Sequence, residues 1–243
     1  MGKKGRREKL SPLQFDLESY DDTDIDLDIS LPTSDPKNQN QRNYTRMLYG
    51  MKPMIFAIGP AGTGKTMLAC HAGIHGLCDN SFKKIVITRP AVSVEEDIGY
   101  LPGTLEEKMD PWTRPIMDIF FEFYSQSQIT HMLREKIIEI CPLAFMRGRT
   151  FKHAFIIADE MQNSTPNQMK MLLTRIGYES KIVVTGDLHQ HDRKYENNGL
   201  KDIFDRIKNN LSSRIEYILF NHEDIERSPV VKDVLKIYGD LKE

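Results

Sequence analysis

Residues 54–66 read MIFAIGPAGTGKT, an apolar run that breaks into glycines and closes on a lysine and a threonine. Residues 59–66 match G-x-x-x-x-G-K-[ST] in full, after a predicted strand and before a predicted helix, as a P-loop does. The glycines let backbone N–H groups turn around a phosphate, and the positive end of the helix dipole adds to the attraction. The sequence therefore predicts a nucleotide site made by Gly59, Pro60, Ala61, Gly62, Thr63, Gly64, Lys65 and Thr66.

Similar strand and helix patterns recur along the chain. Short apolar runs rich in β-branched residues alternate with longer amphipathic segments, at 54–58, 84–88, 154–158, 181–185 and 214–220. Strands that are apolar on both faces are covered on both sides, which indicates a mainly parallel sheet flanked by helices. Thr165-Pro166 and Ser228-Pro229 each predict a helix start with a capping hydroxyl and an early proline. We expect one α/β domain over residues 41–243.

A longer helical insertion lies between Pro90 and Pro142. We expect it to be interrupted at Pro102, Pro111 and Pro115, because proline lacks the N–H that a helix needs. Its aromatic cluster DIFFEFY (118–124) is expected to be core.

Composition excludes several classes of protein. The 243 residues carry 33 basic and 35 acidic side chains, which give a formal charge of -2. This excludes a protein that coats nucleic acid through its overall positive charge. Three cysteines without a C-x-x-C pair fit neither a disulfide framework nor a zinc module. No apolar run reaches the roughly 18 residues of a membrane span. We expect a cytoplasmic protein with no membrane segment.

Residues 1–40 differ from the rest. A basic arm leads into an acidic tract over residues 16–28, and such blocks lack the apolar area that offsets the entropy of ordering. We expect a disordered tail. In DIDLDISL (24–31), however, apolar and polar residues alternate, so a strand added to a neighbour's sheet edge is the alternative.

Two further strand ends supply the polar groups that a P-loop needs for hydrolysis. In AFIIADE, Asp159 is expected to hold Mg²⁺ together with Thr66, and Glu160 to orient or deprotonate the attacking water. In VVTGDLHQ, Gln190 is expected to contact both the γ-phosphate and that water. Lys65 would reach the β- and γ-phosphates of ATP. Glu160 argues against a small-molecule kinase.

These motifs together resemble the PhoH-like ATPases, a phosphate-starvation-inducible family related to superfamily 1 helicase motor domains. The family's motifs occur here in the family's order: GPAGTGKT, TRPAV, PLAFMRGRT, ADEMQN, QMKMLLTRIG and TGDLHQ. The sequence after Gln190 departs from the family pattern. The resemblance implies a RecA-like fold, ATP binding and ATP hydrolysis, with links to RNA.

The resemblance also implies roles for single residues. Gln41 and Tyr44 have the Q-x-x-Y spacing of an adenine contact, with Gln39 as a less well spaced candidate, and Arg89 lies in the counterpart of a segment near single-stranded nucleic acid. The strand that ends at Gly186 would lie between the P-loop strand and the DE strand.

The chain after Gly186 is shorter than the 100 to 150 residues, roughly, of a second motor domain. An arginine that completes the site would then come from the chain's own C-terminal segment or from another subunit, which predicts a homo-oligomeric ring such as a hexamer. The candidates are Arg227, Arg147 and Arg149, for which surface ion pairs are the alternative. Arg147 and Arg149 are, like Arg89, also candidates for contact with nucleic acid. Metal sites at His189, His191 and Asp192, or at His71 and His75, are not expected.

Two functions remain open. One is an ATPase coupled to single-stranded RNA or DNA. The other is an ATP-dependent switch or scaffold that assembles a protein partner, which the basic arm and acidic tract would also suit.

Overall fold

The computed structural model describes residues 35–90, 105–190, 198–210 and 212–228, together with residues 230, 231, 234 and 237. The expected tail, its alternative strand at 24–31 and the helix start at Pro229 lie outside the described residues. Within them, no helix is long and apolar enough to cross a membrane.

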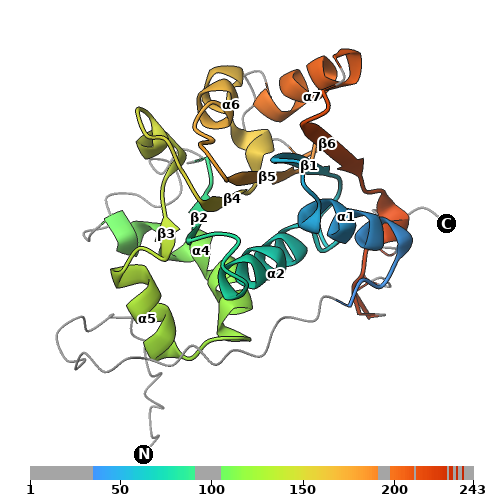
Figure 1. Cartoon of the computed structure of the whole chain (residues 1–243). Helices are drawn as coiled ribbons and strands as arrows, with labels where there is room; N and C mark the ends of the chain where they lie inside the picture. Colours follow the sequence, from blue (N-terminus) through green and yellow to red (C-terminus); the bar gives the residue numbers. More distant parts are fainter. Residues whose placement is uncertain are drawn as a thin grey trace, which may run out of the picture.

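Among the described residues, the core of the fold is a parallel sheet of six strands in the order β3-β2-β4-β5-β1-β6 (Figure 1). The strands are β1 (Met54–Ile58), β2 (Lys84–Thr88), β3 (Ile138–Ile140), β4 (Ala154–Ala158), β5 (Lys181–Gly186) and β6 (Ile215–Leu219). Five of them fall on the predicted apolar runs. The strand that ends at Gly186 lies between the P-loop strand and the DE strand, which confirms the predicted RecA-like order.

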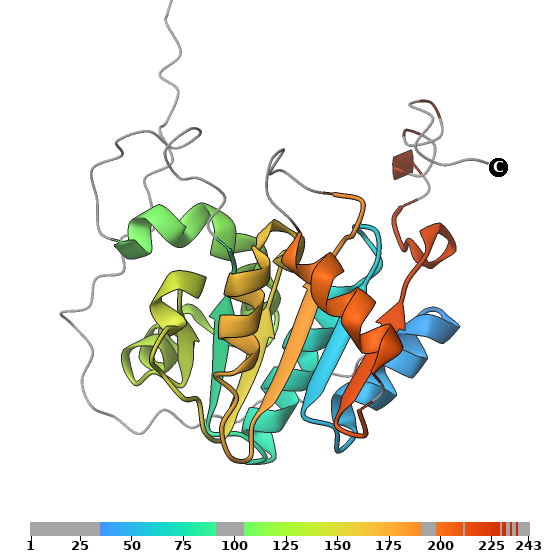
Figure 2. The ribbon, with the colours of Figure 1, turned by 90° about the horizontal axis from the view of Figure 1, so that it is seen from above.

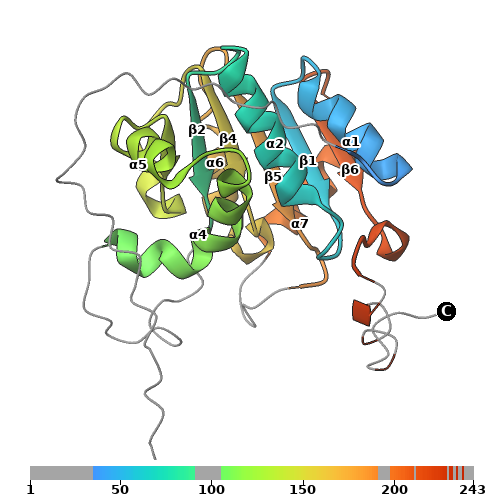
Figure 3. The same cartoon turned by 90° about the horizontal axis from the view of Figure 1, so that it is seen from below.

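Helices cover both faces of the sheet. One face carries α1 (Gln39–Tyr49), α2 (Lys65–Cys78), α4 (Leu105–Phe121) and α5 (Gln126–Arg134), and the other carries α6 (Pro166–Leu173) and α7 (Gly199–Asn209) (Figures 1–3). Strand residues alternate between two cores, as the period of two requires. In β1, Ile55 packs towards α2, whereas Phe56 packs towards α6 and α7. The predicted α/β fold with a parallel sheet flanked by helices is therefore confirmed.

Local signals explain where several elements begin. Thr165 caps α6 with its hydroxyl, Gln168 bonds back to the Thr165 N–H, and Pro166 occupies the first turn, so the predicted helix start is confirmed. In the part of the chain that the structure describes, short 3₁₀ segments follow β3, β4 and β6: η1 (Leu143–Met146), η2 (Met161–Asn163) and η3 (His222–Asp224).

The insertion differs from the prediction in one respect. Helix α4 continues through Pro111 and Pro115, where an interruption was expected. Its C-terminal half buries Ile116 and Phe120 in the core beside α2, and such packing outweighs local propensity. Phe120 and Tyr124 are buried, as predicted for the aromatic cluster.

Candidate functional site

The candidate site lies where the carboxyl ends of neighbouring parallel strands meet. β1 ends in the P-loop, β4 ends before Asp159, β5 ends at Gly186, and Arg89 follows β2. The Gly59 N–H donates to the Gly186 carbonyl at 3.0 Å, which fixes the start of the P-loop against the adjacent strand end. The sheet order therefore brings motifs from distant parts of the sequence together.

Lys65 opens α2 and turns back into the loop that precedes it. Its Nζ donates to the Gly59 and Pro60 carbonyls, at 2.7 Å each, and to the Thr63 hydroxyl at 3.2 Å. Burial lowers the pKa of the Lys65 ammonium, while carboxylates at 187, 160 and 159 oppose the shift without cancelling it. The ammonium thus occupies the cradle and has carboxylates beside it.

Two P-loop glycines are required by backbone conformation. Gly62 and Gly64 have φ of 81° and 80°, in the left-handed region that side chains with a Cβ disfavour. A Cβ at Gly62 would also come within 2.5 Å of Arg227 Nε. The loop therefore keeps its backbone N–H groups open to a ligand only if these positions stay glycine.

Asp159 is buried at the end of β4 and collects donors from several elements. The Thr66 hydroxyl donates to Oδ1 at 2.8 Å, the Thr185 hydroxyl donates to the same oxygen, and Arg89 lies 3.5 Å from Oδ2. Carboxylate and hydroxyl oxygens are ligands that Mg²⁺ prefers, so Asp159 and Thr66 fit this metal. Thr185 was not predicted, although its position directly before the GD pair was the available signal.

Glu160 has an unusual backbone for a residue that is not glycine, with φ 53° and ψ 38°. Such strain is concentrated at functional sites and persists only where neighbours enforce it. The Glu160 side chain is 40% exposed and pairs with Arg89 at 3.1 Å, and Gln162 Nε2 donates to it. The carboxylate therefore faces the cleft and is held on two sides.

Gln162 is a second residue that the sequence did not reveal. Its amide oxygen accepts from the Asp187 N–H at 3.1 Å, while its amide nitrogen donates to Glu160. The side chain is buried and joins the end of β4 to the end of β5. A glutamine two residues after the DE pair gives no local signal for this bridge, because the bridge depends on strand order.

A cleft of about 330 Å³ unites these groups. Lys65, Thr66, Asp159, Glu160 and Gln190, which the sequence analysis assigned to one nucleotide site, all line it, and Arg89 lines it too. Pro115, Ile116 and Ile119 of α4 form an apolar side. Arg89, which was expected near nucleic acid, pairs in this structure with Asp159 and Glu160, two of the carboxylates that line the cleft.

The two residues expected at adenine lie behind the P-loop. The Gln41 amide donates to the Thr63 carbonyl at 3.2 Å and accepts from the Lys37 N–H at 2.7 Å. Tyr44 is 0% exposed, and its hydroxyl donates to the Lys65 carbonyl at 3.3 Å. Tyr44 therefore offers no surface to adenine in this structure, and both residues brace the loop.

The three arginine candidates lie in different surroundings. Arg227 lies against Gly62 of its own chain, where the neighbouring Glu226 N–H donates to the Gly62 carbonyl at 3.0 Å. Arg149 forms a two-pronged ion pair with Glu139 and lies over the Phe151 ring at 4.5 Å. Arg147 is exposed. The structure thus distinguishes the ion-paired Arg149 from the exposed Arg147, whose roles the sequence did not distinguish.

Comparison with known families decides the kinship. The sequence model described as "PhoH-like protein" matches residues 34–239. The chain belongs to the PhoH-like family. PhoH-like proteins from Bacillus subtilis and a Synechocystis strain are 42% identical over 203 residues and 40% identical over 206 residues. Protein PhoH of Escherichia coli is 37% identical over 206 residues.

The alignments cover 83%, 83% and 84% of this chain but 63%, 61% and 57% of the three PhoH-like relatives. Among solved structures, the SWI2/SNF2 ATPase core of Sulfolobus solfataricus in complex with double-stranded DNA is 11% identical, with a TM-score of 0.41 over 84% of this chain and 53% of that one. A Pif1 helicase structure is 14% identical, with a TM-score of 0.34 over 82% and 47%. These structural likenesses are too distant to carry an argument about function.

Proposed function

We propose that this chain binds Mg²⁺ and ATP and hydrolyses ATP to ADP and phosphate. The observation that carries the proposal is the convergence of Lys65, Thr66, Asp159, Glu160 and Gln190 on one cleft at the carboxyl edge of the sheet. Family membership supports the same reading, because the match to PhoH-like proteins spans the P-loop and both later strand ends.

Each group has a distinct task in this proposal. Lys65 exchanges its carbonyl partners at Gly59 and Pro60 for the β- and γ-phosphates. Thr66 and Asp159 hold Mg²⁺, which when bound neutralises developing phosphate charge. Gln41 is kept as the candidate adenine contact. Because it is buried, with its amide bonded to the Thr63 carbonyl and the Lys37 N–H, it would have to release one of these partners to reach adenine.

Hydrolysis itself requires a base and an in-line water. Glu160 accepts a proton from the water while the water oxygen bonds to the γ-phosphorus. The bond between the γ-phosphorus and the oxygen that leaves with ADP breaks. Gln190, which lines the same cleft, orients that water. Arg89 pairs with Glu160 in this structure, and we propose that it moves to the γ-phosphate when ATP binds, which frees the carboxylate to act as base.

We further propose that turnover is coupled to single-stranded nucleic acid, RNA in particular, in a cytoplasmic homo-oligomer. Arg227 lies against its own P-loop, so completion of the site within one chain competes with completion by a neighbouring subunit, and the proposed oligomer depends on the second of these. Mixing wild-type subunits with an Arg227→Ala, Lys65→Ala double variant tests for sharing between subunits. Activity that falls only in proportion to the inactive subunits would rule out a shared site.

The test of the proposed function is phosphate release with and without single-stranded RNA. We expect magnesium-dependent release that RNA stimulates several-fold, and loss of release in Lys65→Ala and Glu160→Gln. Release that RNA leaves unchanged, together with capture of a protein partner, would favour the ATP-dependent switch. Normal release by Lys65→Ala would refute the site assignment.

A further inference from the structure

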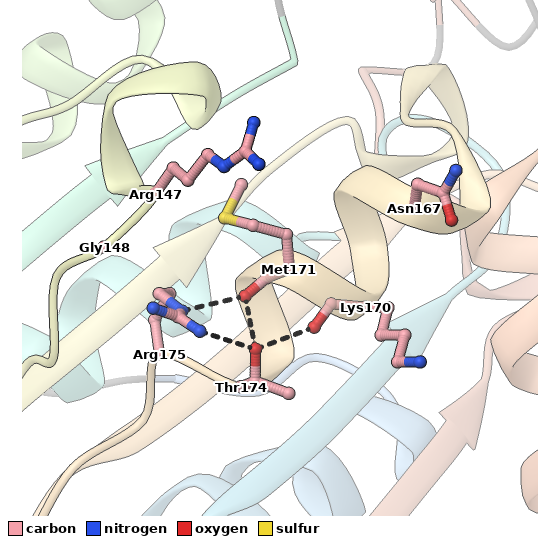
Figure 4. Close-up of a pocket in the computed structure, with 7 residues that line it drawn as sticks. All are labelled: Arg147, Gly148, Asn167, Lys170, Met171, Thr174 and Arg175. Carbon is pink, nitrogen blue, oxygen red and sulfur yellow. Dashed lines mark hydrogen bonds between the residues drawn. The ribbon is translucent and has the colours of Figure 1, made fainter.

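A second hollow, of about 440 Å³, lies outside the nucleotide cleft (Figure 4). One wall is the loop after η1, with Arg147 and Gly148. The other is α6 and the residues that follow it, with Asn167, Lys170, Met171, Thr174 and Arg175. We call this hollow the basic groove. Figure 4 shows the Met171 side chain reaching from α6 towards Arg147.

The charges of the basic groove are not matched by acids. Its lining contains three cations and no carboxylate. Within the described part of the chain, Arg147 and Lys170 have no ion pair, and Arg175 donates to uncharged acceptors: the Met171 and Arg149 carbonyls at 3.2 Å each and the Thr174 hydroxyl at 3.1 Å. A local excess of positive charge in a chain of net charge -2 marks this surface as a site for a polyanion.

Shape and spacing fit an extended strand. Positions 167, 170 and 171 of α6 and position 174 directly after it have the i, i+3, i+4, i+7 spacing of one helix face. They span about 10 Å at 1.5 Å per residue, room for more than one backbone phosphate. Phe145, two residues before Arg147, is 56% exposed. Phe145 is not among the residues that line the groove, but it belongs to η1, the segment that leads into Arg147. Exposed aromatic rings together with nearby cations are the combination with which proteins stack bases and hold the backbone of single strands. An acidic protein segment would need the cations but not the ring.

Both walls of the basic groove are linked to the nucleotide cleft. On one side, the Leu143 N–H of η1 bonds to the carbonyl of Arg89, whose guanidinium pairs with Glu160. On the other, Gln162 of η2 bonds to Glu160, and α6 begins three residues after η2. A change in the partners of Arg89 and Glu160 would therefore act on both walls.

We propose that the basic groove binds the backbone phosphates of single-stranded nucleic acid through Arg147 and Lys170, with Phe145 as a stacking surface. This inference rests on the proposed coupling of ATP turnover to nucleic acid, and it assigns that coupling to a place. Arg175 is a positioning residue here, because its hydrogen bonds hold the end of α6 against the loop at Arg149.

The experiment is fluorescence anisotropy of the full chain with labelled single-stranded RNA of about 12 nucleotides, a length within the span of single-strand sites. The test variant is Arg147→Ala with Lys170→Ala. The matched control is Lys201→Ala with Arg206→Ala, which removes one lysine and one arginine whose charges are paired with Asp205 and Asp202 on α7. Thermal unfolding of both variants checks that each still folds.

We expect the groove variant to bind RNA about tenfold more weakly. The slope of log affinity against log salt should become less steep by about 1.4, because each of the two lost phosphate contacts contributes about 0.7 on a single strand. The control should keep the wild-type slope. Single-stranded DNA of the same sequence shows whether the sugar matters. Replacing Phe145 with Leu should weaken binding without changing the slope.

Two results would overturn the inference in distinguishable ways. If the wild type binds RNA and the groove variant binds it with the same affinity and slope, the basic groove is not the site, and the proposed coupling survives. If the wild type hydrolyses ATP but binds no RNA, while a peptide of residues 16–28 binds in a manner that the groove variant loses, the groove holds an acidic protein segment and the coupling to nucleic acid is also wrong.

Discussion

The nucleotide cleft and the basic groove treat charge in opposite ways. In the cleft, Arg89 pairs with Asp159 and Glu160, and Lys65 bonds to loop carbonyls. In the groove, Arg147 and Lys170 have no carboxylate partner within the described residues. A cleft that satisfies its own charges must exchange partners when a ligand binds, so substitutions there should act on chemistry. Substitutions in a groove with free charges should instead lower the affinity for the ligand, and salt should weaken this contribution to binding.

The largest effect is expected at Lys65. Lys65→Ala removes the charge that the cleft holds for the phosphates, and we expect phosphate release to fall by about 1000-fold or more, as for other groups that stabilise transferred phosphate. The control is Lys52→Ala, which loses a lysine paired with Glu216 at the surface. An equal fall in both variants would show that lost charge in general, and not the cleft, lowers activity.

Glu160→Gln should come next. Loss of the base should lower kcat by about 100-fold to 10000-fold. Nucleotide affinity should change little, because the amide keeps the shape and the hydrogen-bond capacity of the side chain. Binding of a fluorescent ATP analogue measures the affinity. If affinity falls as far as kcat, Glu160 serves chiefly to hold the strained turn at the end of β4.

A smaller effect is expected from Thr185→Val, which keeps the shape of the side chain but removes its hydrogen bond to Asp159. Outer groups that orient a metal ligand contribute about 10-fold to 100-fold in metal affinity. We therefore expect half-maximal activity to need at least about tenfold more Mg²⁺, with kcat at saturating Mg²⁺ nearly restored. The surface variant Thr130→Val is the control, and an unchanged Mg²⁺ requirement would show that Thr185 does not position Asp159.

The smallest effect sharpens the contrast between Arg149 and Arg147. Arg149→Ala should lower the free energy of unfolding by about 1 kcal/mol, since it removes a pair with Glu139 and the packing on Phe151. Arg147→Ala should change it by less than about 0.5 kcal/mol. Chemical denaturation at pH 7 measures both. Equal losses would contradict the separation of these two arginines.

The pH dependence of the Arg149 effect follows from Glu139. Burial raises the pKa of this carboxyl, but the hydrogen bond and charge of Arg149 outweigh burial and leave the pKa below 4.5. The folded state therefore binds fewer protons than the unfolded state, and the stabilisation is present above pH 4.5. The difference between wild type and Arg149→Ala should shrink as the pH falls through the lowered pKa.

Much of the cleft could be predicted because its signals are local. A glycine-rich loop and acidic residues at strand ends are readable in short windows, and parallel strands bring their carboxyl ends to one edge. Gln162 and Thr185 could not be assigned in this way, because their roles depend on which strands are neighbours. β3 is only three residues long, and one of them is Glu139, so its hydrophobic signal was weak.

Only part of the basic groove could be predicted from the sequence. Arg147 and Arg149 lie two residues apart, and the sequence alone does not distinguish their roles. Their difference arises because Glu139 of β3, which also pairs with Lys84, bonds to Arg149 and not to Arg147, whereas Arg147 lines the groove together with Lys170 of α6. Such pairings between segments distant in sequence set the charge of a surface, and periodicity does not report them.

The central claim is that this cleft hydrolyses ATP with Glu160 as the base. Wild type and Glu160→Gln are each mixed with ATP and Mg²⁺, separated from free nucleotide, and the nucleotide that stays bound is extracted and identified. We predict ADP from the wild type and intact ATP from Glu160→Gln. ADP from both, formed at the same rate, would contradict the account.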